Sequence, residues 1–168
     1  MLNHEQLGKS LLECLTEVKS LLTHAHSIAM KQQQALVSSD AEEIVVTTRA
    51  QEEILRRVGE ADQRAAAIAT ELAQSAGLDS DTSDITALAE VAGFPNSIYI
   101  KQEMESISSI SEQVRRTNEV NQQLLQNGLE IITCCLRTVA NDPGPASYGN
   151  DASFGGFQAN VLSLDLRV

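Results

Sequence analysis

The sequence predicts an all-α protein: an elongated antiparallel three-helix coiled-coil bundle with a short connecting helix and a flexible C-terminal tail. Apolar residues recur at alternating steps of four and three along three long segments, which is the 3.5-residue repeat of a coiled-coil seam. Hydrophobic residues make up 42% of the 168 residues but aromatic ones only 3%, so Leu, Ile, Val and Ala must build the core. This composition favours helix-on-helix packing over a β-sandwich, because strands prefer β-branched and aromatic residues.

The first helix is expected at about residues 4–37. A second apolar row beside its seam widens the stripe enough for contact with two neighbouring helices. The seam consists of Leu7, Leu11, Cys14, Val18, Leu21, Ala25, Ile28, Gln32 and Ala35, and the second row of Leu15, Leu22, Ala29 and Leu36.

The second helix is expected at about residues 41–76. Asp40 lies three residues before Glu43, which is the spacing of a capping box. Ser39 and Glu42 have the same spacing, so either pair can begin the helix. The seam consists of Ile44, Thr48, Gln51, Leu55, Val58, Asp62, Ala65, Ala69, Leu72 and Ala76. The connection from the first helix is so short that the two helices must form an antiparallel hairpin.

A short connecting helix is expected at residues 84–92 and the last long helix at about 97–140. The seam of the last helix consists of Ile107, Ile110, Val114, Thr117, Asn121, Leu124, Gly128, Ile131 and Cys135. The same spacing upstream includes Ile100 and Met104, with one slip in phase near Ile107. From residue 141 the chain is rich in Gly, Pro, Asn and Ser, a composition typical of flexible linkers. We therefore expect a helical bundle over residues 1–140 and a flexible tail over 141–168, which ends in an apolar terminus.

Charge and hydropathy exclude several classes of function. Acidic residues number 23 and basic ones 12, for a formal net charge of −11. This balance argues against binding to nucleic acid or to an anionic membrane, since both need clustered Lys and Arg. The chain contains no apolar run of about 18 residues, so no membrane insertion is expected. It begins without the basic residues and apolar run of a secretory signal, which predicts a cytoplasmic location.

No catalytic constellation is evident in the sequence. Cys14, Cys134 and Cys135 have neither a disulfide framework nor a metal-ligand spacing. No Gly-rich phosphate loop precedes a helix, and the carboxylates are spread along solvated faces. We therefore expect no enzyme activity, no cofactor and no metal site.

A second apolar row beside the seam of the last helix is the most informative feature. It consists of Leu125, Leu129, Ile132, Leu136 and Val139. A helix that lies between two neighbours needs two apolar rows, so packing against a second helix of the bundle is the alternative for Leu125 and Leu129. The last helix, however, is about 66 Å long against roughly 50–54 Å for the other two. Ile132, Leu136 and Val139 are therefore expected to have no partner within the chain, and exposed patches of this kind mark protein-binding sites.

Two further sets of residues are candidates for function. Asn118 and Asn121 lie at or beside the seam, where an Asn fixes helix register; direct contact with a partner is the alternative. The apolar terminus needs a surface to lie on, and we assign it to the same binding site. Its residues are Val161, Leu162, Leu164 and Leu166, which precede Val168.

Four passages of the chain resemble the FlgN family of flagellar export chaperones. The first is Gln32-Gln-Gln-Ala-Leu36 followed by Asp40, and the second is Gln51-Glu52 with Leu55 and then Glu60 with Arg64. The third is Asn118-Glu-Val-Asn121-Gln-Gln-Leu124-Leu125, similar to the family's Asn-x-x-Asn-x-x-Leu-Leu. The fourth is Ser147-Tyr148-Gly149, followed by a Gly-rich stretch and Leu162-Ser-Leu164-Asp165. The four passages occur in the family's order and span nearly the whole chain.

The resemblance implies a cytoplasmic chaperone of flagellar type III export. Such chaperones bind the C-terminal helix of the hook-associated proteins FlgK and FlgL, which form the hook–filament junction, through their own C-terminal part. They prevent premature association of these clients and deliver them to the export gate protein FlhA. The tail tyrosine implicated in the gate contact would be Tyr148 in this chain. Nucleotide hydrolysis is not expected.

A structural coiled-coil adaptor or oligomerisation module is the alternative from another functional class. Such a protein would use its long helix to self-associate, and a homodimer fits the pattern. The apolar end of the tail favours the chaperone, since an adaptor has no evident need for it.

Overall fold

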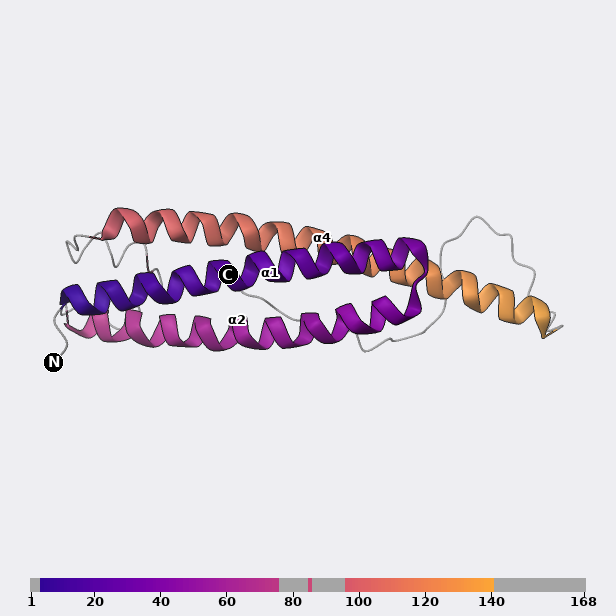
Figure 1. The fold of residues 1–168 in the computed structure, drawn as a ribbon, viewed down its shortest axis with the longest axis horizontal. Helices are drawn as coiled ribbons and strands as arrows, with labels where there is room; N and C mark the ends of the chain where they lie inside the picture. Colours follow the sequence, from indigo (N-terminus) through magenta and orange to yellow (C-terminus); the bar gives the residue numbers. More distant parts are fainter. Residues whose placement is uncertain (1–3, 76–84, 86–95, 141–168) are drawn as a thin grey trace, which may run out of the picture. The chain divides into compact units, whose positions relative to one another are not determined.

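The computed structural model describes residues 4–75, 85 and 96–140, and it contains three long helices. They are α1 (His4–Ser38), α2 (Ala41–Ser75) and α4 (Ser97–Val139) (Figure 1). No β-strand occurs in these ranges, so the predicted all-α fold is confirmed. The short connecting helix expected at 84–92 and the tail expected at 141–168 lie outside the described residues, except for the helical Ile85.

The chain divides into two compact units between Gln126 and Asn127. In the first unit, α1 and α2 form an antiparallel hairpin, and α4 runs parallel to α1 (Figure 1). The direction of α4 follows from two contacts: Ile100 packs near Leu7 at one end, and Asn121 bonds to Ala29 near the other. The second unit contains the last turns of α4. None of the helices in the described part of the chain is long and apolar enough to span a bilayer.

Ser39 and Asp40 alone connect α1 to α2, and their geometry explains how two residues suffice. Ser39 has φ 56°, the left-handed conformation that ends many helices. The N–H of Ser39 donates to Leu36 O at 3.3 Å and that of Asp40 to Ala35 O at 2.9 Å, the two hydrogen bonds of a Schellman motif. Asp40 Oδ1 then accepts from the N–H of Glu43 at 3.1 Å, so of the two capping pairs Asp40 and Glu43 begin α2.

The core of the first unit consists of two adjoining apolar clusters. One contains Leu7, Leu11, Leu15, Ala65, Ala69, Leu72, Ala73 and Ile100. The other contains Val18, Leu21, Leu22, Ala25, Ile28, Ile54, Val58, Ala61 and Val114. Both clusters draw residues from all three helices, and α1 contributes its predicted seam together with its second row. The two apolar rows of α1 thus serve two neighbours, as the sequence predicts.

The seam predicted for α2 is partly wrong. Asp62 is exposed and its neighbour Ala61 is fully buried, while Thr47 is buried and Thr48 exposed. Two different four-and-three repeats can be drawn along α2, and they share every second position, among them Val58. The apolar pattern alone therefore does not show which of the two faces the core. The structure adopts the phase that keeps the Asp62 carboxylate in water, because burial of an unpaired charge is costly.

Candidate functional site

The last turns of α4 present a continuous row of exposed apolar side chains. The exposed fractions are 47% for Leu125, 56% for Leu129, 57% for Ile132, 64% for Leu136 and 83% for Val139. Leu125 and Leu129, which the sequence left open between core and surface, are therefore surface residues in this structure. Isolated apolar residues on a surface are ordinary, but a row along four turns of one helix is a candidate binding surface.

The predicted core seam of α4 extends too far. Ile131 is 64% exposed and Cys135 is also exposed, although both were expected to face the core. An apolar repeat shows that a helix face needs a partner, but it does not show that the partner belongs to the same chain. We define the exposed α4 face as Leu125, Leu129, Ile131, Ile132, Leu136 and Val139.

The exposed α4 face continues the face by which α4 packs in the bundle. Ile100, Val114 and Asn121 are buried, and they lie at multiples of seven residues along the helix. Each step of seven residues turns an α-helix by only about 20°, so Gly128 and Cys135 continue this line at about 20° and 40° from Asn121. The same side of α4 is thus buried in its first part and exposed in its last part.

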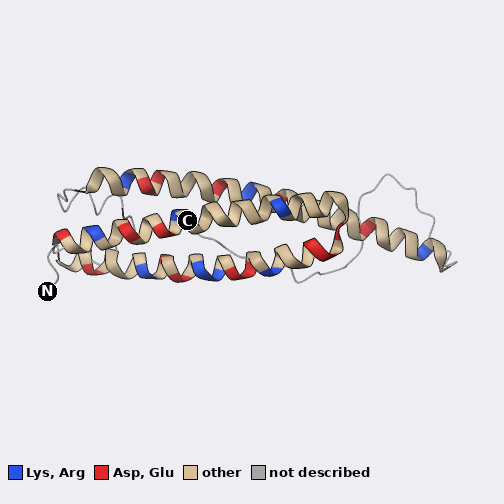
Figure 2. Ribbon diagram, in the orientation of Figure 1, with Lys and Arg blue, Asp and Glu red and all other residues tan. Residues whose placement is uncertain are grey.

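Charged residues are sparse in the segment that carries the exposed α4 face. Between Leu125 and Val139 only Glu130 and Arg137 are charged, and Figure 2 shows this part of α4 almost without charged residues. At 100° per residue, both project from the side opposite Gly128. The face itself is therefore uncharged, which suits an apolar partner rather than an ionic one.

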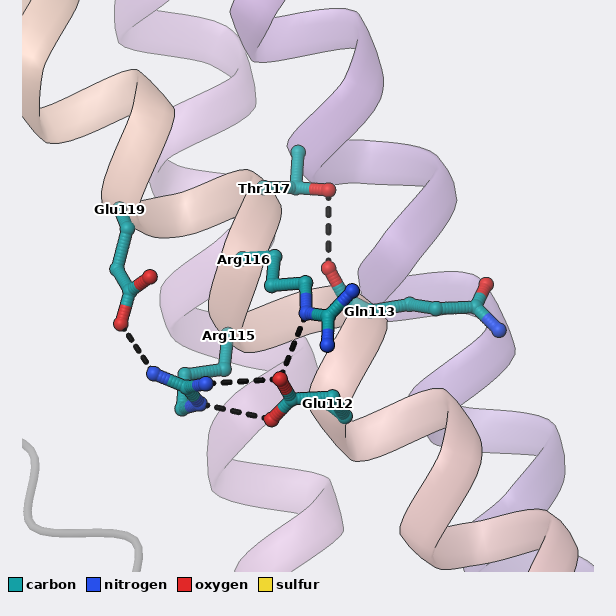
Figure 3. A network of polar contacts seen from close by, with 6 residues as sticks. All are labelled: Glu112, Gln113, Arg115, Arg116, Thr117 and Glu119. Atoms are coloured by element: carbon teal, nitrogen blue, oxygen red, sulfur yellow. Dashed lines mark hydrogen bonds and ion pairs between the residues drawn. The ribbon is translucent and has the colours of Figure 1, made fainter.

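The preceding turns of α4 carry a network of exposed ion pairs instead (Figure 3). Arg115 donates to both carboxylate oxygens of Glu112, at 2.8 and 2.9 Å, and Arg116 Nε donates to Glu112 Oε1 at 2.7 Å. Arg115 also pairs with Glu119. The hydrogen bonds from Arg115, then the one from Arg116, lower the pKa of Glu112 to about 2. These pairs at i,i+3 and i,i+4 spacing support a solvated helix side.

Asn118 and Asn121 join α4 to both helices of the hairpin. Asn118 Oδ1 accepts a hydrogen bond from Gln51 Nε2 of α2 at 2.7 Å. Asn121, only 4% exposed, donates through Nδ2 to Ala29 O at 2.9 Å and to Gln32 Oε1 at 3.2 Å, both on α1. Leu124 is half-buried one turn further along α4. These bonds are the kind that register control requires, and the sequence did not reveal their partners.

A small groove of ≈ 240 Å³ lies beside these amides. It is lined by Gln32, Leu36, Ile44, Thr48, Gln51, Asn118, Asn121, Gln122 and Leu125, none of them charged. Gln32 Nε2 donates to Thr48 Oγ1 across the hairpin at 3.1 Å, so the amides also tie α1 to α2. Leu125 therefore belongs both to this groove and to the exposed α4 face.

The remaining candidate residues are either dispersed or outside the described ranges. Cys14 is half-buried, whereas Cys134 and Cys135 are exposed, and all three are free thiols. Among the residues with described positions, no group of three or more His, Cys, Asp or Glu could hold a metal ion. Tyr148, and the tail residues Val161, Leu162, Leu164 and Leu166, lie outside the part of the chain that the structure describes.

An all-helical bundle with a long uncharged apolar helix face is typical of proteins that bind other protein segments. Comparison with known families gives the particular family. Residues 1–153 match the family model described as FlgN protein, and the chain belongs to the FlgN family. Members of this family are flagellar export chaperones that bind hook-associated proteins, and this chain is a flagellar export chaperone. Comparisons with curated proteins and with solved structures gave no match.

Proposed function

We propose that this chaperone binds the C-terminal helix of FlgK and FlgL on the exposed α4 face, in the cytoplasm, and delivers both proteins to the export gate protein FlhA. One observation carries the proposal: the apolar side of α4 that packs in the bundle continues, uncovered, through Leu129, Ile132 and Leu136 to Val139. A client helix with an apolar stripe would complete this side as another bundle helix does.

The size of the exposed α4 face favours moderate, reversible binding. Full burial of a large aliphatic side chain contributes about 1.5–3 kcal/mol, and these side chains are already partly covered. Association costs about 4–15 kcal/mol in lost freedom of motion, which offsets much of the gain. A client held in this way is protected from self-association and can still be released at the gate.

The C-terminal residues extend the proposal beyond the described structure. We assign Val161, Leu162, Leu164 and Leu166 to client binding as a second apolar segment, in a tail that begins at residue 141. We assign Tyr148 to gate docking; the family match, which ends at residue 153, includes it. Under this division, removal of residues 141–168 leaves the bundle folded and weakens client and gate binding.

Self-association through the same face is the competing function. A coiled-coil adaptor or a homodimer would bury Ile132 and Leu136 against a second copy. The net charge of −11 on each chain opposes this association, so a client with a different charge balance is the better partner. The proposal includes no catalytic step and no cofactor.

Titration calorimetry with peptides of the C-terminal helices of FlgK and FlgL tests the proposal. The double variant Ile132→Asp/Leu136→Asp should keep its helical circular dichroism and lose measurable peptide binding, because a buried unpaired charge is costly. The matched control is Val45→Asp/Val46→Asp, which places the same charges on exposed valines of α2 and should bind as the unaltered protein does. Unchanged binding by the α4 variant would exclude this face, and doubled mass in light scattering without peptide would favour the homodimer.

A further inference from the structure

Gly128 lies in the middle of the exposed part of α4, where a glycine weakens the helix. Glycine lowers helix stability relative to alanine because its backbone loses more conformational freedom on folding. The backbone at Gly128 is helical and does not adopt the left-handed conformation that favours glycine. Apart from the adjoining residues and the nearby backbone of its own helix, a Cβ atom built at Gly128 would meet no atom within 4 Å. Nothing in the described part of the chain therefore requires a glycine at this position.

The position of Gly128 on the helix suggests what requires it. Gly128 continues the line of Ile100, Val114 and Asn121, the buried residues of α4. Its neighbours three and four residues away lie on either side of it on the helix surface. They are Leu124, Leu125, Ile131 and Ile132. No side chain comes within 4 Å of a Cβ built at Gly128, so the helix surface is open there, and we call this opening between the four aliphatic residues the hollow.

We propose that Gly128 is the point of closest approach for the client helix, and that a large aliphatic or aromatic side chain of the client enters the hollow above it. The inference rests on the proposed function and adds the shape of the contact. The occupant is helical and apolar because the line of Gly128 is continuous with the interface that α4 already makes with the hairpin. In helix packing of this kind a knob from one helix enters a hole formed by four residues of the other, and a glycine deepens that hole.

A pair of glycine-to-alanine variants separates this role from a general effect on helix stability. Gly128→Ala adds one methyl group to the floor of the hollow. The control is Gly59→Ala, since Gly59 is exposed in the interior of α2 and its Cβ would also meet nothing within 4 Å. Both variants should melt at or above the temperature of the unaltered protein, because alanine favours the helix. Only Gly128→Ala should weaken peptide binding, by roughly tenfold, because overpacking separates the two helices.

Calorimetry with the FlgK and FlgL peptides also identifies the entering residue. Each large apolar residue of the peptides is replaced by alanine, one at a time. For one of these peptides, Gly128→Ala and the unaltered chaperone should bind with similar or equal affinity, because the side chain that enters the hollow is gone. Equal affinity of Gly128→Ala and the unaltered protein would overturn the proposal, as would equal weakening by Gly59→Ala. If Ile132→Asp/Leu136→Asp abolishes binding while Gly128→Ala does not change it, only the close approach is refuted. If Ile132→Asp/Leu136→Asp also binds normally, the proposed surface fails together with the hollow.

Discussion

The side-chain amide of Asn121 donates a 2.9 Å hydrogen bond to the main-chain carbonyl oxygen of Ala29 and thereby joins α4 to α1. The side chain of Asn121 is almost completely buried, and Gln32 Oε1 accepts a second bond from it at 3.2 Å. A buried amide without partners is costly, so a slip of α4 along α1 would be penalised. We infer that Asn121 sets the register of α4 on the hairpin.

Asn121→Asp tests this role with almost no change of shape. An ionised carboxylate cannot donate to Ala29 O, and burial raises its pKa above the ordinary value of about 3.9. At pH 7 the free energy of unfolding should therefore fall by about 1–3 kcal/mol. The deficit relative to the unaltered protein should shrink as the pH falls toward 4, because the protonated form can donate. Urea denaturation at pH 7 and 4.5 measures both values; Gln123→Glu, at an exposed site, should show no such deficit. A deficit that is independent of pH would contradict the assignment.

The three long helices and the hairpin could be predicted because their determinants are local. The 3.5-residue repeat gives helix extent, and Asp40 marks the beginning of α2. Which positions of α2 face the core could not be predicted in the same way, because the two possible repeats share Val58. What excluded Asp62 from the core was the cost of desolvating its charge, which the spacing of apolar residues does not express.

The candidate site was predicted only in part, for a different reason. The apolar row from Leu125 to Val139 is visible in the sequence, and its exposure followed from the excess length of the last helix. The core assignment of Ile131 was wrong, since the residue is 64% exposed. An apolar side chain at a repeat position needs a partner, but the sequence does not show whether that partner belongs to the same chain. The bonds from Gln51 to Asn118 and from Asn121 to Ala29 depend on the spatial register of three helices, which no local pattern encodes.

The turn between α1 and α2 should respond in opposite directions to two substitutions. Asp40→Ala removes the oxygen that accepts the N–H of Glu43, and loss of such a cap should lower the free energy of unfolding by about 1 kcal/mol. Ser39→Gly relieves the left-handed conformation of Ser39 and should raise it by about 0.5–1 kcal/mol. Urea denaturation followed by circular dichroism measures both changes. Equal and same-signed changes would mean that the turn does not have this geometry in solution.

Glu112 should titrate far below an ordinary glutamate. Its bonds to Arg115 and Arg116 lower its pKa to about 2, so the folded state favours the ionised form. The stabilisation is present above the unfolded-state pKa of about 4.3 and is lost as the pH falls through that value toward 2. Carboxyl carbon shifts in an NMR titration should place the midpoint near 2, and Arg115→Gln should raise it. High salt should weaken the effect, because the network is exposed and screened. An ordinary midpoint for Glu112 would show that the ion pairs do not persist in solution.

Leu11 and Leu136 provide the sharpest contrast between the core and the exposed α4 face. Leu11 is fully buried and Leu136 is 64% exposed, although both are leucines in the apolar row of a long helix. Leu11→Ala should lower the free energy of unfolding by about 2–5 kcal/mol, because it removes buried surface and leaves a cavity. Leu136→Ala should change it by no more than about 0.5 kcal/mol, since Leu136 is mostly exposed and little buried surface is lost. Urea denaturation at a low protein concentration measures both values without interference from self-association. Equal losses would mean that Leu136 is covered in the free protein, and the exposed α4 face would then not be available to a client.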